Sequence, residues 1–169
     1  FSGDIASNIL YGNPDGSEAE MTEAATIAQA TEFIEQKKKK YKSTISQGGS
    51  NVSGGQKQRL SIARAIAKHP DIYIFDDSFS ALDYKTDATL RAKLKEKTSE
   101  STVMIVAQRI STILHADQII VLDDGQIVGK GTHKELLKNC EAYYQIASSQ
   151  LSEKELEEDL KEVESYAKR

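Results

Sequence analysis

The sequence predicts an α/β domain built on a parallel sheet. Residues 72–75 and 103–107 are two short apolar runs, the second within a predicted strand over residues 102–107, and uninterrupted runs of this kind are typical of strands that are buried on both faces. Between them, Leu90 and Leu94 lie four residues apart, which predicts a helix from about Thr86. A strand, a helix and a second strand in this order place the two strands parallel in one sheet.

Composition and charge exclude several classes of protein. The chain has 169 residues, of which 38% are hydrophobic and 28% charged, and this balance argues against a largely disordered chain. Its apolar runs reach only four or five residues, whereas a helix that spans a membrane needs about 20. The 22 Lys and Arg against 26 Asp and Glu give a net charge of −4, so we expect no nucleic-acid partner.

The cysteine and histidine content argues against disulfides and structural zinc. Cys140 is the single cysteine, which excludes a disulfide within the chain and fits a reducing, cytosolic setting. The three histidines, at positions 69, 115 and 133, are scattered along the sequence rather than clustered at the spacing of a zinc site.

The first half of the chain is expected to contain two helices and two loops. Residues 1–16 are rich in turn-forming residues, most of all at positions 12–16. Ser17 and Glu20 have the spacing of a capping box, which predicts the start of a helix. The Ser- and Gly-rich residues 43–55 predict a loop, and residues 56–68 then predict a second helix.

The second half is expected to contain a hairpin and two capped helices. The dipeptide at residues 124–125, Asp-Gly, lies between two β-prone runs and predicts a tight turn. Two further capping boxes each predict a helix, the first running to about residue 149 and the second to residue 169: Thr132 with Glu135, and Ser152 with Glu155.

The first candidate site is the Val-Ser-Gly-Gly-Gln segment at residues 52–56, just where a helix is predicted to begin. Free backbone N–H groups and the positive end of the helix dipole attract anions there, and glycines allow a phosphate to approach the backbone closely. Ser53 and Gln56 also have the spacing of an ordinary capping box. Both interpretations remain open from spacing alone.

The second candidate site is the pair Asp76 and Asp77, which follows the first predicted strand. Ligands of open α/β sheets bind at the carboxyl ends of the strands. A carboxylate at that position can hold Mg²⁺, and a second one can orient or deprotonate a water molecule. The alternative is that acidic residues simply close a strand where it meets solvent.

If the two candidate sites bind nucleotide phosphates, the protein also needs a Walker A loop, Gly-x-x-x-x-Gly-Lys-Ser/Thr. This sequence contains none. The chain also opens on Phe-Ser-Gly without an initiator Met. We therefore expect further sequence upstream that carries the main phosphate-binding loop, and we expect this chain to be inactive by itself.

Residues 51–65, which read NVSGGQKQRLSIARA, closely resemble the signature motif and following helix of ABC ATPases. Other segments resemble further motifs of this family and occur in the family's order along the chain. Residues 1–5 resemble the segment after the Q-loop, and residues 72–77 resemble the Walker B strand. Residues 80–83 resemble the D-loop, residues 103–112 the strand and switch loop, and residues 131–137 the end of the core. Residues 1–3 and 109–112 resemble the exporter branch in particular.

The resemblance implies a partial RecA-like P-loop NTPase core, with a parallel sheet and a β-hairpin, and an α-helical signature subdomain. It divides the chain into three parts. Residues 1–68 would hold the segment after the Q-loop and the helical subdomain, and residues 69–150 the Walker B, D-loop and switch-loop part of the core. Residues 151–169 would form an acidic C-terminal helix.

The resemblance also implies a function, an ATP-hydrolysing motor domain of an ABC exporter on the cytoplasmic face of the cell membrane. Two such domains would dimerise head to tail around two molecules of ATP with Mg²⁺, and would drive transmembrane domains. Asp76 would ligate the metal, and Asp77 and Gln108 would take the catalytic positions. The residues expected to contact nucleotide come from the signature and the D-loop: Val52, Ser53, Gly54, Gly55, Gln56 and Asp83.

Three positions depart from the family pattern. Asp77 stands where the family usually has a catalytic Glu, and a misplacement of about 1 Å can cost roughly 10²-fold in rate. Gln108 replaces the switch His and cannot carry a proton or a positive charge, and Gln47 replaces a usual Glu. The signature is nearly intact, with Val52 as its only mild change. We therefore expect an asymmetric heterodimer in which this chain's own site hydrolyses ATP slowly.

Three alternatives to a transport motor are a soluble ABC ATPase, which is also an enzyme, a regulatory subunit and a plain interaction domain. A soluble ABC ATPase would carry coiled-coil insertions or basic arms, and neither occurs in this sequence. A regulatory subunit that binds nucleotide without hydrolysing it agrees with Asp77 and Gln108, but it leaves the intact signature unexplained. A plain interaction domain does not explain the series of motifs.

Overall fold

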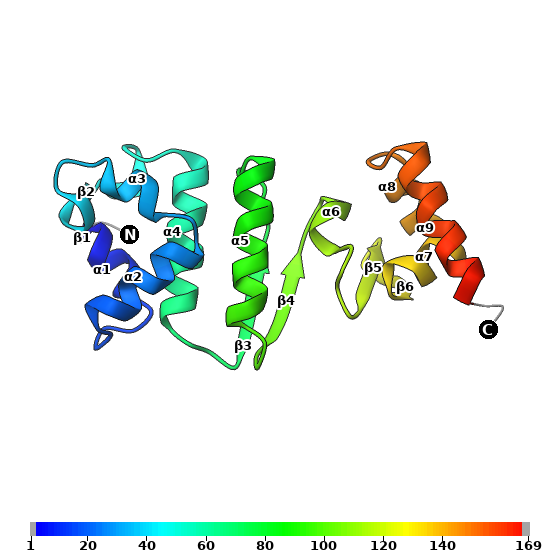
Figure 1. Ribbon diagram of the computed structural model, residues 1–169, viewed down its shortest axis with the longest axis horizontal. Helices are drawn as coiled ribbons and strands as arrows, with labels where there is room; N and C mark the ends of the chain where they lie inside the picture. Colours follow the sequence, from blue (N-terminus) through cyan, green and yellow to red (C-terminus); the bar gives the residue numbers. More distant parts are fainter. Residues whose placement is uncertain (1–2, 167–169) are drawn as a thin grey trace. The chain divides into compact units, whose positions relative to one another are not determined.

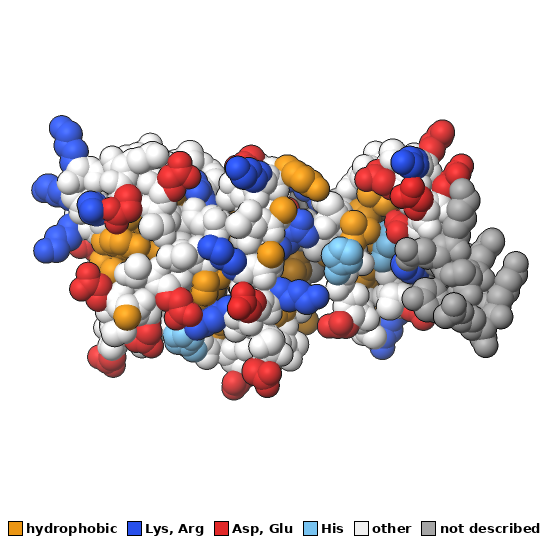
Figure 2. Space-filling model, viewed as in Figure 1, with side chains coloured by type: hydrophobic (Ala, Val, Ile, Leu, Met, Phe, Trp, Pro, Cys, Tyr) orange, Lys and Arg blue, Asp and Glu red, His pale blue; other side chains and the backbone are white. Residues whose placement is uncertain are grey.

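The computed structural model of the chain describes residues 3–166, with side chains described through residue 159. These residues form two compact units, one ending at Val106 and the other beginning at Ala107 (Figure 1). Among the described residues no helix combines the length and the apolar character that crossing a bilayer requires. On the face shown in Figure 2, acidic and basic side chains are interspersed.

The first unit consists of a helical part followed by a short parallel sheet. Helix α4 packs against α1 and α2 in the helical part (Figure 1), and the parallel pairing of β3 with β4 confirms the predicted sheet. The elements of this unit are β1 (Gly3–Asp4), α1 (Ile5–Leu10), α2 (Glu18–Ile27), α3 (Thr31–Glu35), the 3₁₀ turns η1 (Lys40–Lys42) and η2 (Gln47–Gly49), β2 (Thr44–Ile45), α4 (Gly54–Ala67), β3 (Ile72–Asp76), α5 (Tyr84–Lys97) and β4 (Thr102–Val106).

Capping signals in the sequence correctly locate two helices of the first unit, α2 and α4. Ser17 and Glu20 form the predicted capping box at the start of α2. The turn-rich residues 1–16 also contain a short helix, because Asp4 and Ser7 form a capping box that opens α1. The first turn of α1 is also held by burial, since Ile5 is fully buried in the core of the first unit.

The prediction that both strands of the parallel sheet are buried on both faces is wrong for the described chain. Tyr73 and Phe75 of β3 are buried in one core with the apolar face of α5. Ile72 and Ile74, which point to the opposite face, are 60% and 67% exposed. A continuous apolar run indicates that both faces are suited to burial, but it does not say whether an element of the same chain covers each face.

The second unit is a β-hairpin covered by short helices. Strands β5 and β6 are antiparallel, and the turn residues Asp124 and Gly125 both have positive φ, 45° and 73°, as a tight hairpin turn requires. The predicted hairpin is thus confirmed. The elements of this unit are α6 (Ile110–Ile113), β5 (Ile119–Asp123), β6 (Gln126–Gly131), α7 (His133–Asn139), α8 (Glu141–Ser148) and α9 (Glu153–Tyr166).

The predicted helix from Thr132 to about residue 149 is in fact two helices. Thr132 and Glu135 form the expected capping box of α7. The backbone of Cys140 is extended, with φ −130° and ψ 102°, and it separates α7 from α8. The Cys140 side chain is buried against the hairpin. The predicted end of the last helix, at residue 169, lies outside the described residues.

A buried polar network joins the three C-terminal helices. The two ring nitrogens of His133 on α7 lie 2.7 Å from the Tyr143 hydroxyl of α8 and 3.1 Å from a carboxylate oxygen of Asp159 on α9. Leu156 of α9 is buried in the same apolar core. Burial raises the pKa of Tyr143 to about 12, and the negative charge of Asp159 adds to this effect.

The raised pKa of Tyr143 predicts a loss of stability at alkaline pH. Because the pKa is higher in the folded state than the ordinary value of about 10, the folded protein keeps a proton that the unfolded chain loses. The contribution is fully present below about pH 10 and is lost as the pH rises toward 12. The free energy of unfolding, measured by urea titration, should fall more steeply between about pH 9.5 and 11.5 in the native protein than in Tyr143→Phe; equal slopes would contradict this.

Candidate functional site

The first turn of α4 forms one wall of the candidate site. Ser53 is the N-cap, where its hydroxyl accepts the Gln56 backbone N–H at 3.3 Å and its own N–H donates to the Gln56 side-chain oxygen at 3.1 Å. The capping-box interpretation is therefore confirmed. The N–H groups at the start of a helix have no partner within the helix, so those of Gly54 and Gly55 stay suited to an anion. One helix end can serve both purposes.

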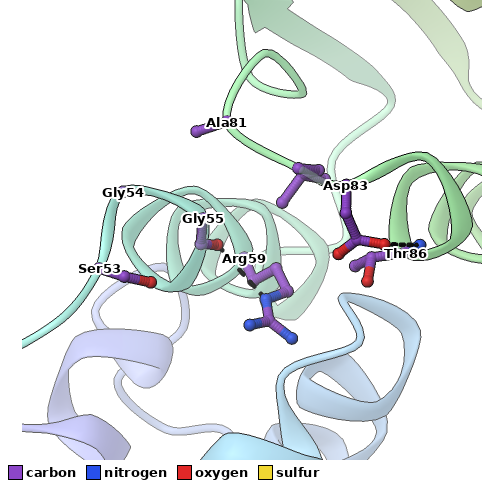
Figure 3. Close-up of a pocket in the computed structure, with 8 residues that line it drawn as sticks. Ser53, Gly54, Gly55, Arg59, Ala81, Asp83 and Thr86 are labelled. Atoms are coloured by element: carbon purple, nitrogen blue, oxygen red, sulfur yellow. Dashed lines mark hydrogen bonds between the residues drawn. The ribbon is translucent and has the colours of Figure 1, made fainter.

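The opposite wall is the loop that follows β3. A pocket of about 430 Å³ lies between the two segments, and Figure 3 shows the start of α4 facing the loop that carries Ala81 and Asp83. Four residues predicted to contact nucleotide line this pocket: Ser53, Gly54, Gly55 and Asp83. Val52 is buried just before the cap.

The two signature glycines meet different surroundings. A Cβ atom at Gly55 would lie 2.9 Å from the backbone oxygen of Ala81, which is too close without a shift of the loop. A Cβ atom at Gly54 would lie 3.5 Å from the Ala81 side chain, an ordinary contact. Packing within this chain therefore requires glycine at position 55, whereas at position 54 it leaves room for a methyl group.

Gln58 joins the two walls, and the sequence analysis did not identify it. Its side-chain nitrogen donates to the backbone oxygen of Asp77 and to the Ser80 hydroxyl, both at 3.0 Å. Its side-chain oxygen accepts the Ala81 N–H at 2.9 Å. Ser80 also donates to the Asp77 backbone oxygen at 3.1 Å. One amide thus fixes residues 77–81 against α4.

Arg59 places a positive charge beside the pocket and was also missed. Its guanidinium donates to the Gln29 backbone oxygen at 2.6 Å and lies 4.8 Å from the centre of the Phe33 ring. Burial lowers the pKa of Arg59, and the nearby carboxylate of Asp83 opposes that effect. The only sequence signal was a basic residue one helical turn after Gly55.

Asp83 begins the helix that follows the pocket. Its carboxylate accepts the Thr86 backbone N–H at 3.0 Å, which makes it the N-cap of α5. The hydrogen bonds from the Thr86 backbone and side chain lower the pKa of Asp83. The structure gives Asp83 a local capping role at the pocket rim, and its predicted contact with nucleotide stays a prediction.

Asp76 and Asp77 occupy the carboxyl end of β3, as predicted. Asp77 adopts a left-handed backbone with φ 47°, and its N–H donates to the Val106 backbone oxygen at 3.1 Å. The described residues contain no cluster of three or more potential metal ligands. Mg²⁺ is often held by one or two carboxylates together with substrate phosphates, and the exposed carboxylate of Asp76 fits that mode of binding.

Gln108 lies in the second unit, in the loop that leads into α6, and its side chain is exposed. Its backbone oxygen accepts a hydrogen bond of 2.9 Å from the Gln150 side chain. The backbone N–H of Ile110, two residues later, donates to the same side chain. The loop is therefore held by a residue 42 positions away in sequence.

Comparisons with known proteins agree with the motifs. The family described as ABC transporter matches residues 5–80. An uncharacterized ABC transporter ATP-binding protein of Mycobacterium tuberculosis (strain H37Rv) is 48% identical over 153 residues, covering 89% of this chain and 26% of that protein. A protein of Staphylococcus aureus, named as a candidate multidrug export ATP-binding/permease protein, is 42% identical over 150 residues, with the same coverage of 89% and 26%.

The solved structure of a bacterial Atm1-family ABC exporter with ATP bound superimposes with a TM-score of 0.86 at 35% identity, covering 90% of this chain and 27% of that one. Over residues 5–80 the chain matches the ABC transporter family, and the relatives that it matches are ABC transporter ATP-binding proteins. The predicted fold class, a partial RecA-like core with a helical signature subdomain, is thereby confirmed. The chain spans about a quarter of the length of the relatives that it matches.

The two glycines of the ABC signature predict unequal effects on stability. Gly55→Ala should lower the free energy of unfolding by about 1–3 kcal/mol, because the added methyl group forces the Ala81 loop away from α4. Gly54→Ala, the matched control, should change it by less than about 0.5 kcal/mol. Urea unfolding followed by circular dichroism measures both, and equal losses would contradict the packing difference.

Proposed function

We propose that this chain is part of the ATP-driven motor of an exporter, located at the cytoplasmic face of a membrane and paired with a second, different ABC domain and with transmembrane domains. The observation that carries the proposal is the first turn of α4, where Gly54 and Gly55 line an open pocket and helix-start N–H groups are available to an anion. Two of the proteins that the chain resembles are named as exporters, which supports export rather than import.

In this proposal the signature acts on ATP that is held by the partner domain. Ser53 and the N–H groups of Gly54 and Gly55 donate to the terminal phosphate across the interface, and Arg59 adds positive potential nearby. Asp83 borders the same pocket and contacts nucleotide from the D-loop. The sequence of these residues keeps every donor that phosphate recognition needs, so the partner's site is the efficient one.

The chain's own site is proposed to be slow. Asp76 is the residue that would hold Mg²⁺, and the metal would neutralise charge on the phosphate oxygens when bound. Asp77 orients the attacking water, but its carboxylate is one methylene shorter than that of Glu. Gln108 can hydrogen-bond a phosphate and cannot donate positive charge. Both departures from the family pattern therefore affect the proposed reaction: Asp77 acts on the attacking water, and Gln108 acts on the terminal phosphate.

A purely regulatory, nucleotide-binding role is the second candidate, and the same two residues favour it. If no site of the assembly hydrolysed ATP, the chain would hold a complex together only by binding nucleotide. The ATPase activity of the full-length protein, measured with and without a co-expressed partner, distinguishes the two functions. The motor proposal predicts activity only with the partner, and the regulatory alternative predicts none in either case.

Restoring both catalytic side chains should accelerate the slow site. Asp77→Glu together with Gln108→His in the full-length protein should raise the ATPase rate of this site by about tenfold or more. Glu tolerates the left-handed backbone less well than Asp, so a stability loss of roughly 1 kcal/mol is expected alongside. Asp77→Asn, which keeps the backbone preference and removes the charge, should give no gain. An unchanged rate in the double variant would count against the slow-site assignment.

Blocking the signature should stop hydrolysis in the partner's site. Ser53→Arg places a bulky side chain where the partner's terminal phosphate is proposed to lie, and ATP hydrolysis by the assembled heterodimer should be lost. The substitution also removes the helix cap, which typically costs about 1 kcal/mol. Ser53→Ala removes the cap without adding bulk and should reduce the rate far less. Normal activity of Ser53→Arg would refute the assignment across the interface.

A further inference from the structure

The loop that carries Gln108 is held by one side chain from the C-terminal helices. The Gln150 side-chain nitrogen donates to the backbone oxygen of Gln108 at 2.9 Å. Its side-chain oxygen accepts the backbone N–H of Ile110, also at 2.9 Å. The amide thus binds the C=O of one residue and the N–H of the second residue after it. A neighbouring β-strand would make the same two kinds of hydrogen bond to this short segment. The contact fixes the backbone on both sides of Arg109.

The loop has no cap of its own at this point. Arg109 is the N-cap residue of α6, and it makes no side-chain capping hydrogen bond. The first N–H groups of a helix need an outside acceptor, and Gln150 supplies one to Ile110, which is itself 2% exposed. Gln150 therefore supplies an acceptor that the N-cap side chain of α6 does not provide.

Gln150 is itself firmly placed, because it lies at the bend between α8 and α9. Its backbone N–H donates to the Ala147 oxygen at 3.0 Å, and Ala147 is fully buried. The next helix begins directly afterwards with a capping box, in which the Ser152 N–H donates to Glu155 at 2.8 Å. The network of His133, Tyr143 and Asp159 holds α8 and α9 together.

We propose that Gln150 is the positioning residue of the switch loop, through which the helix pair α8–α9 sets the position of the Gln108 side chain toward ATP. This inference rests on the proposed function, since it assigns Gln108 to an ATP site. It extends that function by giving the acidic C-terminal helix a part in the reaction. Any event that displaces α9 from α7 would then loosen the loop and weaken the contact of residue 108 with the terminal phosphate.

The test compares Gln150→Met with Gln145→Met in the full-length protein. Met has nearly the length of Gln but makes neither hydrogen bond. Gln145 is a matched control because its exposed amide donates to Glu141, four residues earlier in the same helix, at 3.0 Å, and not to the loop at residues 107–110. Hydrogen exchange of a peptide that covers residues 107–112 reads the loop directly and needs no ATPase activity. Gln150→Met should accelerate this exchange about tenfold, and Gln145→Met should leave it unchanged.

The catalytic readout uses the variant Asp77→Glu with Gln108→His, whose rate gain reports on this site. Adding Gln150→Met to this variant should lower its kcat at least fivefold, which removes most of the gain. It should change the KM for ATP less than twofold. When residue 108 is Ala instead, Gln150→Met should have almost no effect on kcat, because the side chain that it positions is gone. A general loss of stability would lower kcat in both backgrounds.

The outcomes separate this inference from the proposed function. Faster loop exchange together with loss of the gain supports the positioning role. Exchange and kcat that match those of Gln145→Met overturn it. If Asp77→Glu with Gln108→His shows no gain at all, the slow-site proposal fails, and the exchange data alone then decide whether Gln150 holds the loop: acceleration supports the contact, and unchanged exchange overturns it.

Discussion

The contact between the first turn of α4 and the loop after β3 determines how the candidate site is built. Gln58 fixes residues 77–81 with three hydrogen bonds, and Gly55 lets the Ala81 backbone approach the helix closely. The signature and the loop that begins at Asp77 are therefore held as one piece. If the signature acts on the partner's ATP and Asp77 on this chain's own, a shift at either site is transmitted to the other through this contact.

Two glutamine amides perform the same task in the two units. Gln58 binds the backbone of the loop that carries Asp77, and Gln150 binds the backbone of the loop that carries Gln108. An amide offers a donor and an acceptor together, so one side chain can satisfy both a C=O and an N–H group. It is also neutral, so each loop is fixed without an added charge. The side chains proposed to react stay exposed while their backbones are held.

Local features of this fold could be predicted from sequence, and distant ones could not. The capping boxes at Ser17, Ser53 and Thr132 depend on residues three positions apart, and all three form. The contacts of Gln58 and Gln150 span 19 to 42 residues, and nothing in the pattern of the sequence announces them. The prediction that β3 is buried on both faces is wrong for one face, because an apolar run does not show whether another element covers that face. Four residues predicted for the site do line one pocket, whereas the roles of Asp76, Asp77 and Gln108 depend on a bound nucleotide.

The central proposal is that the first turn of α4 binds the terminal phosphate of ATP held by another subunit. The most direct measurement is a structure of the full-length protein with its partner, ATP and Mg²⁺. The account predicts that the Ser53 hydroxyl and the N–H groups of Gly54 and Gly55 lie within hydrogen-bond distance of a terminal phosphate whose other phosphates are held by the partner. A helix tip that contacts no phosphate, or only ATP held by this same subunit, would contradict the account.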